Sequence, residues 1–227
     1  MFPLKDSIPS RHFPYINTLF IIINIIVFFY ELALGERLNQ FMQGYGFIPR
    51  LFFAPFDVVS FKEKIIPLFT SMFLHGNFFH IISNMYFLYI FGDNVEDQFG
   101  HINYFFIYLT FGLIAALTQA ILFPSAEIPT IGASGAVAGV MGAYLIMFPR
   151  AFIKTVVILI VFVTIVDIPA VIFLGLWFLI QFLNGVVQAS AGSAAGVAWW
   201  AHIGGFVIGI CFGIVRIKKY RVSTKCV

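Results

Sequence analysis

Long, predominantly apolar segments recur along nearly the whole of this chain, and they constrain its fold more than any other feature. Of its 227 residues, 61% are hydrophobic and only 10% are charged. A water-soluble domain does not bury so much apolar sequence in one core, whereas apolar stretches long enough to cross a bilayer are the mark of membrane helices. The sequence therefore predicts an all-α polytopic membrane protein.

The apolar segments predict six transmembrane helices in a single membrane-embedded domain over residues 1–227. The predicted spans cover residues 16–34, 77–91, 102–123, 134–149, 169–188 and 195–215. Each approaches the length of about 20 apolar residues that a spanning helix needs.

Two stretches between the spans are less regular. Residues 156–169 are β-branched and apolar, but Asp167 and Pro169 disfavour one continuous helix through them. We expect a segment at the membrane edge that leads into the fifth helix. The aromatic stretch between the first two spans is expected to lie partly in the membrane interface, as short amphipathic pieces.

The distribution of Lys and Arg predicts the orientation, because cytoplasmic loops carry an excess of both. With the amino terminus inside, residues 1–15, the loop after the fourth span and the basic tail 216–227 all become cytoplasmic. We expect both termini in the cytoplasm and, without a transit-like segment, a plasma (inner) membrane location. No further basic stretch with interleaved aromatic residues accompanies the basic tail, so the expected partner is the lipid bilayer and not nucleic acid.

Polar side chains inside the spans are costly and need a reason. His80 and Asn84 are four residues apart in the second span and share one helical face. Ser134 opens the fourth span, and His202 lies in the sixth. Each of them alone is most simply explained as an interhelical hydrogen bond.

Helical rise places these residues at a common depth. Ser134 lies 16 residues before Arg150, and His202 lies 14 residues before Arg216. At about 1.5 Å per residue, both lie roughly 21 to 24 Å above the cytoplasmic ends of their helices, and His80 falls in the same layer. A serine hydroxyl and an imidazole within hydrogen-bonding range form a nucleophile and its general base.

Glycines favour a close approach of the fourth and sixth spans. The small residues that form these two stripes are Gly132, Gly135, Gly139 and Gly142 in the fourth span, with Ala201, Gly205, Gly209 and Gly213 in the sixth. Gly132 and Gly135 also flank Ser134 and support the site, because they let the chain turn into the helix and leave the Ser134 backbone N–H without an intrahelical partner. His80 and Asn84 are candidate side-chain donors to the same oxyanion hole.

His75 is the remaining histidine near this layer. It either supports the site, by holding water or accepting a hydrogen bond, or packs at the mouth of the cavity. The spacing of His75 and His80 lacks the glutamate and the helical register of a zinc protease. We therefore expect neither a metal nor another cofactor.

The motifs "HGNFFHIISN", "GASG" and "AHIGG", in this order on the second, fourth and sixth spans, resemble those of the rhomboid family of intramembrane serine proteases. The resemblance implies a six-helix rhomboid-like bundle with a water-filled cavity open to the outside. It implies a catalytic dyad of Ser134 and His202 without a carboxylate, and an oxyanion hole formed by His80, Asn84 and the Ser134 amide. It also implies single-span membrane proteins as substrates.

The sequence departs from the family pattern near His202. Many members carry an aromatic residue four positions after the nucleophile, where it packs on the imidazole, and that position is Ala138 here. No carboxylate in the spans is placed to orient His202. The alternative function is a catalytically inactive rhomboid-like chaperone or binding protein for membrane proteins, although such relatives usually lose the serine or the histidine. A solute transporter would show an internal repeat, which this sequence lacks.

Overall fold

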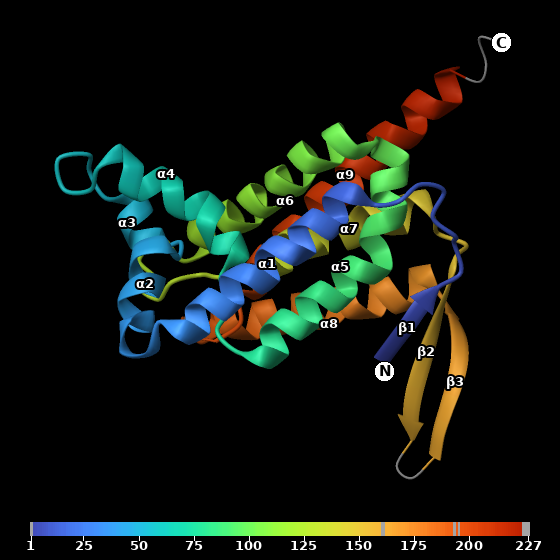
Figure 1. The fold of residues 1–227 in the computed structure, drawn as a ribbon, viewed down its shortest axis with the longest axis horizontal. Helices are drawn as coiled ribbons and strands as arrows, with labels where there is room; N and C mark the ends of the chain where they lie inside the picture. Colours follow the sequence, from blue (N-terminus) through green and yellow to red (C-terminus); the bar gives the residue numbers. More distant parts are fainter. Residues whose placement is uncertain (1, 160–161, 193, 195, 224–227) are drawn as a thin grey trace.

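A computed structural model describes residues 2–159, 162–192, 194 and 196–223 of the chain. It is a bundle of long helices with short helices at one end and a small β-sheet at the other (Figure 1). The helices are α1 (Tyr15–Ala33), η1 (Gly35–Arg37), α2 (Leu38–Tyr45), α3 (Pro49–Phe53), α4 (Phe61–Thr70), η2 (Ser71–Phe73), α5 (Phe78–Phe99), α6 (His101–Leu122), α7 (Ser134–Met147), α8 (Ala170–Ser190) and α9 (Trp199–Ser223).

The predicted helical class is confirmed, but the predicted count of six spans is not. Among the described residues, four helices are long and apolar enough to cross a membrane alone, namely α1, α6, α8 and the part of α9 up to Lys218. The helices before and after the 79° bend between Phe73 and Phe78 provide a fifth span if they are counted together. Helix α7 has only 14 residues, because an extended segment with Gly132 at φ +116° occupies the preceding positions.

The stretch between α1 and α5 contains the short helices α2, α3 and α4, in line with the short pieces predicted there. Helix α4 begins at Phe61 because Ser60 and Glu63 form a capping box. In such a box each side chain satisfies a backbone N–H that the first helical turn leaves unpaired. These helices gather at the end of the bundle opposite the sheet (Figure 1).

The described residues of 156–169, predicted to lead into the fifth helix without being one continuous helix with it, belong to two strands, and the second of these leads directly into α8. Strands β2 (Phe152–Leu159) and β3 (Phe162–Pro169) form an antiparallel hairpin, and β1 (Phe2–Asp6) pairs antiparallel with β2. β-Branched residues favour strands, and Pro169 separates β3 from α8 by serving as its N-cap residue.

The sheet includes the amino-terminal segment of the chain. The predicted amino-terminal segment 1–15 contains β1, which lies beside α5. The carboxyl-terminal part of α9 lies at the same end of the bundle (Figure 1). The predicted basic tail 216–227 is helical at first, since α9 continues to Ser223, and residues 224–227 lie outside the described residues.

Helix α7 lies at the centre of the bundle and packs most extensively on α9. The packing is close because glycines of α9 face backbone carbonyls of α7. A Cβ atom at Gly209 would overlap the carbonyl oxygen of Gly139, and one at Gly205 would overlap that of Gly135. The two stripes of small residues therefore bring the helix backbones into direct contact, and this contact positions the first turns of α7 and α9 next to each other.

Candidate active site

Ser134 and His202, far apart in sequence, meet at the starts of α7 and α9. Ser134 is the first residue of α7, and His202 lies in the first turn of α9. The Oγ atom of Ser134 is 2.8 Å from Nε2 of His202. The distance is that of a hydrogen bond between a hydroxyl and an imidazole nitrogen. A serine in this contact has a base in place to take its proton.

The other ring nitrogen of His202 contacts Gln181 of α8, a residue that the sequence analysis did not select. Gln181 is only 6% exposed, and its Oε1 atom lies 2.7 Å from Nδ1 of His202. An amide oxygen can only accept a hydrogen bond, so this contact places the ring proton on Nδ1 and leaves the Nε2 lone pair for the serine. A glutamine within an apolar span is costly. This cost could have marked Gln181 as a candidate site residue from the sequence.

Aromatic rings also surround the imidazole. Trp177 lies four residues before Gln181 on the same face of α8, and the centroid of its nearer ring is 6.1 Å from that of His202. The Trp199 ring approaches the imidazole edge-on at the same centroid distance of 6.1 Å. Ala138 is fully buried against α9. Trp177 of α8 and Trp199 of α9 therefore place aromatic rings beside the imidazole. Many family members have an aromatic residue for this purpose at the position of Ala138.

Helix α5 contributes His80 and Asn84 from the opposite wall. The helix begins at Phe78, where the Asn77 side chain caps it by accepting a 2.9 Å hydrogen bond from the His80 backbone N–H. Asn84 is 6% exposed, and within the described part of the chain its buried Nδ2 atom donates to no protein atom. A buried amide without a partner is costly. This Nδ2 group is therefore available to a ligand in the pocket.

The segment before α7 lies directly against this wall. Gly132 adopts φ +116°, and a Cβ atom there would come within 2.6 Å of the His80 ring and 3.7 Å of the Asn84 amide nitrogen. The first backbone N–H groups of any helix have no intrahelical partners, and at the start of α7 no side chain caps them. Gly135 has a different role, because a Cβ there would meet Ala115 of α6 at 2.5 Å.

His75 packs behind His80 and does not line the pocket. It is 1% exposed, and its ring meets the His80 ring edge-on with centroids 5.0 Å apart. Its backbone N–H lies 3.2 Å from both carboxylate oxygens of Glu31. Of the two alternatives for His75, the structure favours packing, here against the imidazole of His80.

These groups line one cavity of about 610 Å³ between α5, α7, α8 and α9. Its polar side chains include His80, Asn84, Ser134, Gln181 and His202. Much of the remaining lining is apolar or aromatic, as in most ligand sites. No group of three or more His, Cys, Asp or Glu residues is arranged for a metal ion within the ranges that the structure describes.

The long apolar helices define a multi-pass integral membrane protein, and its pocket brings a serine into contact with a histidine. Comparison with known families identifies it further. The family model described as the Rhomboid domain matches residues 62–219, which is most of the chain. The chain belongs to the rhomboid family.

Individual relatives agree with this assignment. The chain is 34% identical over 162 residues to RHOMBOID-like protein 6, mitochondrial, of Arabidopsis thaliana, covering 71% of this chain and 47% of that protein. It is 29% identical over 204 residues to Rhomboid protein 1, mitochondrial, of Saccharomyces cerevisiae, covering 87% and 52%. The chain thus spans about half the length of these curated relatives. Their names give no support to the predicted plasma membrane location, whereas an integral membrane protein is supported.

Proposed function

We propose that this protein is a serine-type endopeptidase that cleaves the transmembrane segments of single-span membrane proteins. The observation that carries the proposal is the 2.8 Å contact between Ser134 Oγ and His202 Nε2 inside a cavity. Membership of a family whose members are generally intramembrane serine proteases supports it. The unpaired Asn84 amide on the facing wall adds a donor for the charge that such a reaction develops.

The reaction is acyl transfer in two stages. Ser134 Oγ attacks the peptide carbonyl carbon while His202 Nε2 accepts the hydroxyl proton, and the proton then passes to the leaving amine as the C–N bond breaks. A water molecule attacks the acyl enzyme next, again giving a proton to His202, and the proton returns to Ser134 as the ester breaks. Gln181 is a positioning residue that holds the imidazole by accepting from Nδ1–H.

The carbonyl oxygen becomes negatively charged at each tetrahedral stage and needs hydrogen-bond donors. We assign this role to the Asn84 side-chain amide, the His80 imidazole and the backbone N–H of Ser134. Donors aimed at the position of the oxyanion stabilise the transition state more than the substrate. Support comes from the position of Gly132, whose missing side chain leaves room beside His80 and Asn84.

The orientation belongs to the same proposal. Both termini lie on the cytoplasmic side, together with the basic residues of segment 1–15 and of the predicted tail 216–227. The catalytic layer then lies toward the outer side, where Ser134 and His202 begin their helices. Substrate helices enter with their outer ends near this layer.

Fluorophosphonate labelling of the full chain in detergent tests the proposal. The reagent should modify Ser134 covalently, and both Ser134→Ala and His202→Ala should abolish the label, since the hydroxyl must be activated. Ser190→Ala is a matched control, because Ser190 is an exposed serine of α8 bonded only to the Val186 carbonyl in the described contacts. A wild-type protein that resists labelling but binds membrane proteins would favour the inactive chaperone instead.

A further inference from the structure

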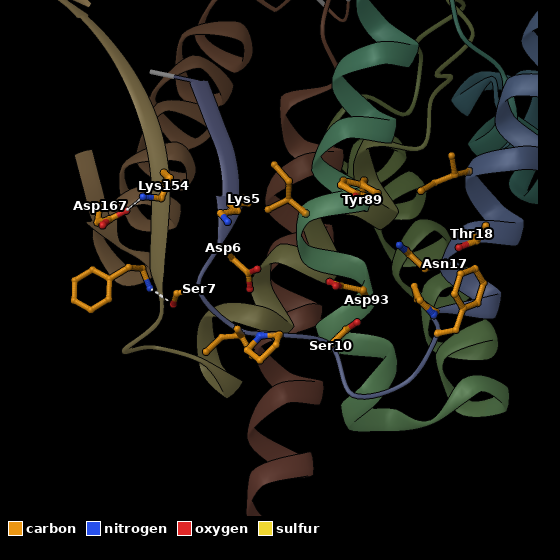
Figure 2. A pocket seen from close by; sticks show the side chains of 17 residues that line it. Lys5, Asp6, Ser7, Ser10, Asn17, Thr18, Tyr89, Asp93, Lys154 and Asp167 are labelled. Carbon is orange, nitrogen blue, oxygen red and sulfur yellow. Dashed lines mark hydrogen bonds and ion pairs between the residues drawn. The ribbon is translucent and has the colours of Figure 1, made fainter. Parts of the chain in front are cut away.

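A second cavity, far from Ser134, lies between the amino-terminal segment, α1 and α5, and has a volume of about 740 Å³ (Figure 2). Polar and charged side chains occupy much of its wall, including Lys5, Asp6, Ser10, Asn17 and Asp93. The carboxylates of Asp6 and Asp93 point toward one another across it (Figure 2). None of these residues takes part in the proposed proteolytic reaction.

An apolar groove of about 480 Å³ adjoins this cavity along the α1–α5 seam. The two spaces share Ile21 of α1 and Tyr89 of α5, so the polar cavity continues into the groove. Phe28 and Ile81 close the bottom of the groove, where both are buried. From Tyr89 to Phe78 the groove follows α5 for about 16 Å at the helical rise per residue. This length matches one leaflet, which is about half of the 30 Å hydrocarbon core.

The charges of the cavity define what its polar end can hold. Lys154 and Asp167 form an ion pair with a 3.5 Å separation and compensate each other. The other charged side chains of the cavity wall are one cation, Lys5, and two carboxyl groups, Asp6 and Asp93. Burial raises the pKa of Asp6, while the hydrogen bond from the Tyr144 hydroxyl acts in the opposite direction. A bound cation would offset the cost of keeping these carboxylates charged.

From this combination we infer a specific site for one phospholipid with an ethanolamine headgroup, such as phosphatidylethanolamine. One acyl chain lies in the α1–α5 groove, the ammonium group lies between Asp6 and Asp93, and the phosphate lies near Lys5. The headgroup must carry both charges, because the cavity presents both. A primary ammonium donates hydrogen bonds to carboxylates, whereas a quaternary choline has no N–H to donate. A headgroup with only negative charge would face the two acids unpaired.

The test uses the delipidated full chain in maltoside detergent and follows its thermal midpoint as lipid is added. Phosphatidylethanolamine should raise the midpoint saturably, since a ligand that binds only the folded state stabilises it. Native mass spectrometry should retain one such lipid per chain. Phosphatidylcholine and phosphatidylglycerol should bind about tenfold or more weakly. Soluble phosphoethanolamine should leave the midpoint unchanged, because it lacks the acyl chain.

Two adjacent isoleucines of α1 provide matched variants. Ile25 lines the groove and is 40% exposed, whereas Ile26 is 63% exposed and does not line it. Ile25→Trp should fill the groove and abolish the lipid-dependent rise, while Ile26→Trp should retain it. Lys5→Gln, at an exposed position, should weaken the effect of phosphatidylethanolamine without changing the lipid-free midpoint. Equal responses to the three phospholipids, an unsaturable rise, or equal loss in both tryptophan variants would overturn the proposal.

Discussion

At the scale of single residues, Ser134 and His202 should behave as one unit. Either Ser134→Ala or His202→Ala should abolish peptide cleavage, and the double variant should be hardly slower than either single one, because both remove the same activated nucleophile. The measurement is kcat/KM for a single-span substrate in one detergent, with thermal midpoints to confirm folding. Full activity in either single variant would contradict the catalytic assignment.

Asn84 makes a different contribution, since its amide would act only on the charged transition state. Asn84→Ala should lower kcat by a factor on the order of 10²–10³, the usual effect of losing one oxyanion donor. KM should stay nearly constant, because the ground state does not use this bond. If Asn84 instead joins helices, the expected change is about 0.6 kcal/mol of stability. A loss of thermal stability in proportion to activity would favour that structural role.

Gln181 should matter through the imidazole that it holds. Gln181→Leu removes the acceptor for Nδ1–H and should lower kcat with little change in KM, whereas Gln181→Glu keeps an acceptor and should restore part of the rate. Asn184→Ala is the control, because Asn184 is a partly exposed amide of α8 bonded to the Ile180 carbonyl. Equal losses in the Leu and Glu variants, with lowered midpoints, would make Gln181 a packing residue only.

At the scale of elements, the close packing of α7 and α9 depends on glycine. Gly209→Ala should lower the thermal midpoint and the activity together, because the added methyl group would overlap the Gly139 carbonyl oxygen and push the helices apart. Gly175→Ala on α8 meets no atom within 4 Å and should be neutral or slightly stabilising, since alanine is the better helix former. Thermal unfolding of both variants is the measurement, and equal midpoints would refute the packing argument.

At the scale of the whole molecule, the proposed activity predicts which substrates are cut. A peptide carbonyl within a helix is hydrogen-bonded and must be released before Ser134 reaches it, and glycine or proline lowers that cost. A single-span substrate with a Gly-Ala pair near its outer end should therefore be cleaved faster than a poly-leucine span of equal length. The rates are compared in the same liposomes, and equal cleavage of both would count against the proposed entry of substrates.

Hydrophobic periodicity and spacing predicted the helical class and the positions of the long helices, and they selected His80, Asn84, Ser134 and His202, which line one cavity. These properties are local, because apolar length and helical rise can be counted along a single segment. Neither property depends on which helices are neighbours. The predicted count of six spans was not confirmed among the described residues, because α7 is short after the left-handed Gly132 and α5 qualifies as a span only together with the bent segment before it.

Only the tertiary structure decided the remaining features, because each depends on contacts between distant segments. Residue Phe2 of β1 pairs with Val156 of β2, and no local pattern at either position names its partner. Gln181 meets His202 because α8 packs on α9, which places an amide where the sequence offers no carboxylate. The sequence thus predicted which polar groups share a layer, whereas the packing of the helices determined which of those groups touch.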